Sequence, residues 1–81
     1  MGREAKEFTM KMNGKFGYEI LNAQGDVIDE AGAEFNTRLL ALRSLREMYA
    51  RMPDATCGCL KTYSRGMVQF DTIIGSIGSV D

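Results

Sequence analysis

One helical segment, set between stretches with strand periodicity, constrains the fold of this chain more than any other feature. From Arg38 to Met52 apolar side chains recur at spacings of three and four, forming one stripe. The stripe consists of Ala41, Leu42, Leu45, Met48, Tyr49 and Met52. Asn36-Thr37 offers an N-cap and Pro53 a stop. Because a single apolar stripe must be buried against another apolar surface, we predict that this helix packs on one antiparallel sheet.

Residues before the helix predict three strands. Apolar side chains alternate over 8–12 and again over 16–20, on either side of Asn13-Gly14. Asn-Gly suits the tight turn that joins two antiparallel strands, so we predict a hairpin here. After a turn at 23–26, Val27-Ile28 predicts a short third strand, which Ala31-Gly32-Ala33 brings to an end.

Residues after the helix predict a second hairpin. The runs 56–65 and 67–74 are rich in β-branched and aromatic residues, and Gly66 separates them. The predicted order is therefore βββαββ, an α+β two-layer sandwich with one helix on an antiparallel sheet. We expect a flexible leader at 1–6, one domain at 7–74 and a tail at 75–81.

Composition and charge exclude several classes of function. An 81-residue chain holds one core, and ten basic against eleven acidic side chains give a net charge of −1. No global field therefore draws the chain to nucleic acid or to anionic lipid. No apolar run approaches the ~20 residues needed to cross a bilayer, and the charged N-terminal residues precede no apolar segment. We expect no membrane association and a cytoplasmic location.

Motifs for catalysis are also missing from the sequence. The chain has no histidine, and its glycines are spaced as turn residues rather than as a phosphate-binding loop. Asp29 and Glu30 are neighbours in a strand and point to opposite faces, so they do not converge on one substrate. Cys57 and Cys59 share a strand face and are predicted to fill space as small apolar groups. We therefore predict no enzymatic activity, no cofactor and no metal site.

The distribution of charge along the chain gives two candidate contact surfaces. Residues 19–34 contain only acidic charges, whereas the helix is basic and presents arginines opposite its apolar stripe. At least one of Leu39 and Leu40 must point away from the sheet, which suggests a contact surface beside these arginines. A solvated face with ion pairs from Glu47 to Arg43 and Arg51 is the alternative interpretation. The candidate partner-binding residues are Asp26, Asp29, Glu30, Glu34, Leu39, Leu40, Arg43, Arg46 and Arg51.

Two resemblances bear on fold and function. Residues 17–28, followed by Phe35-Asn36-Thr37 and the helix, resemble the ββα unit of the YegP-like family over about a third of the chain. The tandem second unit of that family is missing here, and the resemblance implies fold without chemistry. In size, patchy charge and lack of catalytic motifs the chain resembles phage-encoded inhibitors such as the anti-CRISPR proteins. That resemblance implies blocking of a larger host assembly.

Three hypotheses follow for the function. The first is a small protein-binding module, in one form a phage or mobile-element inhibitor that blocks its target sterically or electrostatically. The second is a nucleic-acid-binding domain with Phe16, Tyr18 or Tyr63 as stacking groups. Its basic residues would be Arg43, Arg46, Arg51, Lys61 and Arg65. The third is a homodimer formed through edge strands.

Overall fold

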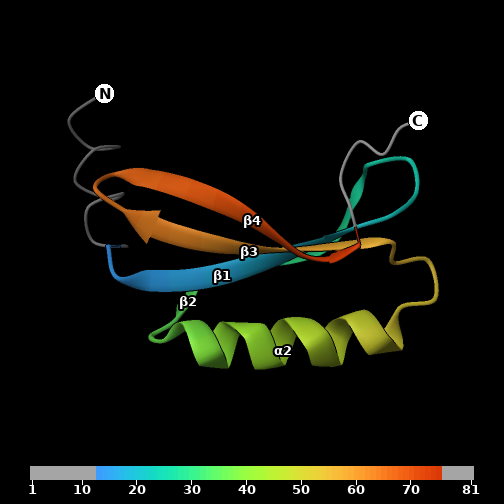
Figure 1. Cartoon of the computed structure of the whole chain (residues 1–81), viewed down its shortest axis with the longest axis horizontal. Helices are drawn as coiled ribbons and strands as arrows, with labels where there is room; N and C mark the ends of the chain where they lie inside the picture. The colour runs from blue at the N-terminus through green and yellow to red at the C-terminus, as the bar shows by residue number, and fades with distance from the viewer. Residues whose placement is uncertain (1–12, 76–81) are drawn as a thin grey trace.

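The computed structural model describes residues 13–75, which form one four-stranded antiparallel sheet and one helix (Figure 1). The strand order in the sheet is β2-β1-β3-β4, and α2 lies along one face. The elements are β1 (Lys15–Leu21), β2 (Val27–Phe35), α2 (Arg38–Arg51), β3 (Cys57–Ser64) and β4 (Met67–Gly75). The predicted α+β fold, with one helix packed on an antiparallel sheet, is confirmed.

Helix α2 begins and ends where capping predicts. Thr37 adopts an extended conformation, and its side-chain oxygen accepts a hydrogen bond from the backbone N–H of Leu40 at 3.2 Å. At the other end the N–H of Met52 donates to the carbonyl of Tyr49 at 3.2 Å, and Pro53 follows. The predicted helix is thus confirmed, with its last residue one position earlier than expected.

The core lies between α2 and the two central strands. Ile20, Leu45 and Leu60 are fully buried, and Tyr18 is buried with them. Gly58 of β3 faces the helix, because a Cβ built on it would lie 3.0 Å from the Leu45 side chain. The missing side chain lets α2 approach the sheet closely, so the apolar stripe of the helix and the central strands share one compact core.

Strand β2 is longer than predicted. The sequence suggested a short strand at Val27-Ile28 with an interruption at 31–33, and this boundary is wrong, since β2 continues to Phe35. The register explains the difference. Phe16 pairs with Phe35 and Tyr18 pairs with Ala31, so β1 advances by two residues where β2 advances by four. The small residues at 31–33 therefore form an irregularity inside the strand rather than its end.

Glycine at position 17 makes this irregularity possible. A Cβ on Gly17 would lie 2.2 Å from the carbonyl oxygen of Gly32 and 2.4 Å from that of Ala31. Real side chains do not approach backbone atoms so closely, so only glycine fits. Because Gly17 has no side chain, the backbone of β2 can lie directly against this position of β1.

The two predicted hairpins have different outcomes. The second is confirmed, because β3 and β4 join through the two-residue turn Arg65-Gly66, whose φ angles are both positive at 55° and 74°. The strand predicted at 8–12 lies outside the described residues. Both edges of β1 are occupied, by β2 and by β3, so the predicted pairing of 16–20 with 8–12 is wrong. The Asn13 side chain instead accepts a hydrogen bond from the N–H of Gly66 at 3.2 Å.

Candidate interaction surfaces

The outer face of α2 carries five of the predicted contact residues. Leu39 and Leu40 are 65% and 46% exposed, so both leucines point away from the core. Helical spacing places Leu39, Arg43 and Arg46 in one row, with Leu40 beside Arg43. Arg51 lies exposed in the last turn. The structure therefore brings these five residues together on one side of the helix, which we call the helix surface.

The arginines of the helix surface form no ion pair within residues 13–75. The predicted pairs from Glu47 to Arg43 and Arg51 are absent there, since the described carboxylates all lie beyond 4.0 Å from these guanidinium groups. Arg43, Arg46 and Arg51 are all exposed. The alternative interpretation of a solvated face agrees with the exposure of these arginines, but its ion pairs are absent from residues 13–75, so their positive charge is available to a partner.

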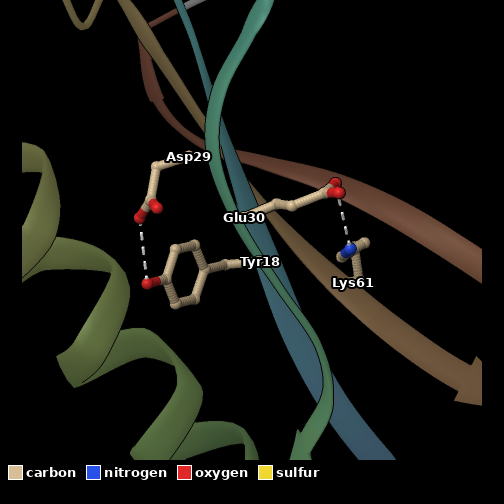
Figure 2. A network of polar contacts seen from close by, with 4 residues as sticks. All are labelled: Tyr18, Asp29, Glu30 and Lys61. Atoms are coloured by element: carbon tan, nitrogen blue, oxygen red, sulfur yellow. Dashed lines mark hydrogen bonds and ion pairs between the residues drawn. The ribbon is translucent and has the colours of Figure 1, made fainter.

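The predicted acidic residues lie on more than one side of the sheet. Glu30 pairs across strands with Glu19 on the face that points away from α2. Asp29 points toward the helix, where its carboxylate accepts a hydrogen bond from the Tyr18 hydroxyl at 3.2 Å (Figure 2). Asp26 lies in the turn before β2, and Glu34 lies in its irregular part. These residues are therefore close in sequence but do not form one acidic surface.

The hydroxyl of Tyr18 is held between the sheet and the helix. Burial raises its pKa above 10.0; a hydrogen bond to Ser44 lowers the value, and the charge of Asp29 raises it. The ring packs near Phe35, with 6.2 Å between the ring centroids. Because Tyr18 is buried, it is a structural link between β1, β2 and α2 rather than a group on which a nucleic-acid base stacks.

Lys61 does not join the basic helix surface. Its neighbours Leu60 and Gly58 belong to the side of β3 that faces α2, so Lys61 points to the opposite side of the sheet. It is only 7% exposed, and its ammonium group lies 3.8 Å from the Glu30 carboxylate (Figure 2). Arg65 lies in the β3–β4 turn. The five basic residues of the nucleic-acid hypothesis are therefore divided between the two sides of the sheet and a turn.

Cys57 and Cys59 lie side by side on β3. Both are buried and free, with 3.8 Å between their sulfur atoms. Burial first, and then the neighbouring Cys57, raise the pKa of Cys59 from 9.0 to about 11. A thiol with this pKa is a poor nucleophile at neutral pH. The predicted role of the two cysteines as buried apolar groups on one strand face is confirmed.

Strand β4 contains exposed apolar residues that the sequence analysis did not select. Met67, Val68 and Phe70 are 70%, 40% and 50% exposed. Residues 67–70 contain no charge, and β4 is the last strand in the sheet order. This uncharged apolar run directly after a predicted turn was the available signal, although the sequence alone did not show that the strand lies at an edge.

Comparison with known proteins gives no match: no family model, no curated protein and no solved structure is similar to this chain. The two resemblances described above therefore stay predictions. Residues 13–75 also contain no helix long and apolar enough to cross a membrane, and no group of three or more carboxylate, histidine or cysteine side chains placed to hold a metal ion.

Proposed function

We propose that this chain is a small non-catalytic protein-binding module whose contact surface is the helix surface. The observation that carries the proposal is the position of Leu39 and Leu40, both exposed, beside arginines that have no ion pair in the described part of the chain. Exposed aliphatic groups next to guanidinium groups suit a partner that combines apolar side chains with carboxylates. An inhibitor that covers a site on a larger assembly is one form of such a module.

The composition of the helix surface favours protein over nucleic acid as the partner. Leucine side chains cannot stack on bases as aromatic rings do, and Tyr18 is buried in the core. Lys61 points to the other side of the sheet. The helix surface thus lacks both the aromatic groups and the additional cation that the nucleic-acid hypothesis requires.

Capture from a lysate of the source or its host, with and without nuclease, tests this proposal. The tagged wild-type chain is compared with a double variant, Arg43→Glu with Arg46→Glu, and with Leu39→Ser. Arg65→Glu is the control, because it makes one substitution of the same kind at an exposed position away from the helix. We expect a protein partner that survives nuclease and binds the double variant at least tenfold more weakly, an order of magnitude typical of central interface residues.

The outcomes separate the two classes of partner. Full binding by the Arg65→Glu control, together with loss of binding in the helix variants, supports the helix surface. Retention of the partner by the double variant contradicts it. Recovery that disappears with nuclease and weakens in all three arginine substitutions moves the function to nucleic acid.

A further inference from the structure

The outer edge of β4 has no partner strand among residues 13–75. The sheet order places β3 on one side of β4 and no described strand on the other. An edge strand presents unpaired N–H and C=O groups, which are a template for pairing with another chain. Proteins usually protect such an edge with lysine, proline, a bulge or a covering segment.

Residues 67–72 of β4 contain no lysine, proline or bulge, and no strand of residues 13–75 pairs with their outer edge. Six consecutive residues pair with β3 without a register shift, from Met67 opposite Ser64 to Thr72 opposite Cys59. Asp71 is the only charged residue in this run, and the register shift occurs only after it. Since Met67, Val68 and Phe70 are also exposed, this edge is both regular and apolar.

The turn at Arg65-Gly66 determines which backbone groups of β4 point outward. In a two-residue hairpin the flanking pair, here Ser64 and Met67, is hydrogen-bonded across the ladder. Backbone direction alternates along a strand, so the N–H and C=O groups of Val68, Phe70 and Thr72 point away from β3. The side chains of these three residues share the face that points away from α2.

We propose that β4 pairs with β4 of a second copy of this chain, antiparallel, about a two-fold axis at Phe70. In this register Phe70 lies opposite its own copy and Val68 opposite Thr72. Gln69 lies opposite Asp71, where an amide faces a carboxylate. If the two-fold axis lay at Asp71 instead of Phe70, the two Asp71 carboxylates would lie opposite each other, which is unfavourable. The register centred on Phe70 therefore places no like charges opposite each other.

Pairing at β4 joins the two sheets into one continuous sheet. A two-fold axis perpendicular to a sheet keeps its faces, so both α2 helices lie on the same side of the dimer. This geometry presents the helix surface twice on one side. The dimer itself does not depend on the proposed function, because α2 and β4 contribute different residues.

Sedimentation equilibrium over a range of concentrations tests the dimer. We expect the wild-type chain to rise from 9.0 kDa to twice that mass, and Phe70→Lys to weaken the association about thirtyfold or more. Val27→Lys is the matched control, since Val27 is exposed to a similar degree on the opposite edge strand. Circular dichroism melts of both variants establish that they fold. A wild-type chain that stays at 9.0 kDa, or a dimer that Phe70→Lys leaves intact, would overturn the proposal.

Two further measurements test the register. Gln69→Lys should strengthen the dimer and Gln69→Glu should weaken it, each by about two- to fivefold, because position 69 faces Asp71 of the other copy. Hydrogen exchange should protect the outward amides of Val68, Phe70 and Thr72 only at concentrations where the dimer forms. Equal effects of both substitutions would overturn the register. Protection of these amides in the monomer would mean that another part of the chain covers the edge, and would overturn the dimer.

Discussion

The two edge strands of this sheet are built in opposite ways. Strand β2 has two register shifts against β1, carries Asp29, Glu30 and Glu34, and is linked by side chains to the core and to β3. Strand β4 is regular over residues 67–72, and among the described residues only its pairing with β3 continues the sheet on that side. Irregular, acidic strands resist pairing with another chain, whereas regular apolar strands favour it. The difference makes β4, rather than β2, the edge at which the proposed dimer forms.

The largest expected effect concerns the close approach that shapes β2. Gly17→Ala should destabilise the fold by about 3 kcal/mol, because the added Cβ meets backbone atoms that cannot rotate away. Gly32→Ala is the matched control; its Cβ would have only the Tyr63 hydroxyl nearby, at 4.0 Å. Urea denaturation followed by circular dichroism measures both. Similar destabilisation by the two substitutions would contradict the role of Gly17.

A second prediction concerns the thiol that faces β4. Cys59 lies opposite Thr72, beside the one register shift between β3 and β4. With a pKa of about 11 instead of 9.0, its thiolate fraction at pH 8 is about 100-fold lower than that of an ordinary cysteine, so alkylation should be correspondingly slow. Iodoacetamide labelling followed by peptide mass spectrometry measures the rate. A rate equal to that of a short cysteine peptide would contradict the raised pKa of Cys59.

The same thiol contributes a pH dependence to stability. Because its folded-state pKa is raised, the neutral thiol stabilises the fold fully below pH 9.0, and this contribution is lost as the pH rises through about 11. Cys59→Ala should therefore reduce the loss of stability measured by urea denaturation between pH 9 and 11. An unchanged pH profile in this variant would contradict the raised pKa.

A third prediction concerns the hydrogen bond that joins β2 to the core. Tyr18→Phe removes the donor to Asp29 and should cost about 1 kcal/mol. Burial raises the folded-state pKa of Tyr18 above 10.0, so its neutral form stabilises the fold below pH 10 and this contribution is lost above it. Thermal melts from pH 8 to 11 should therefore fall less steeply for the variant. Parallel profiles for the two proteins would rule out this contribution.

Local patterns in the sequence predicted the helix, its cap and the second hairpin with its break at Gly66, because these features depend on local spacing. The extent of β2 could not be predicted, since it depends on Gly17 meeting Gly32 across two strands. Asn13-Gly14 suggested a hairpin between 8–12 and 16–20, but β1 is flanked by β2 and β3 instead. The helical spacing of the arginines and leucines in the sequence already indicated the helix surface. Strand alternation predicted that Asp29 and Glu30 lie on opposite faces of the sheet. The position of Lys61 could not be predicted in this way, because it depends on the strand register.

The smallest expected effect concerns the ion pair between β2 and β3. Lys61 is buried, but Glu30 has a side chain that is 60% exposed, and 3.8 Å separates their charged atoms. Water screens the carboxylate, so Glu30→Gln should change the free energy of unfolding by less than about 0.5 kcal/mol, with little dependence on salt. Urea denaturation at low and high ionic strength measures this change.

Tyr18→Phe should lower the free energy of unfolding more than Glu30→Gln does. The first substitution leaves a partly buried carboxylate without its donor, whereas the second leaves an exposed amide in water. A loss of 2 kcal/mol or more in Glu30→Gln would contradict this ranking and would mean that the buried Lys61 ammonium depends on the Glu30 carboxylate as its partner.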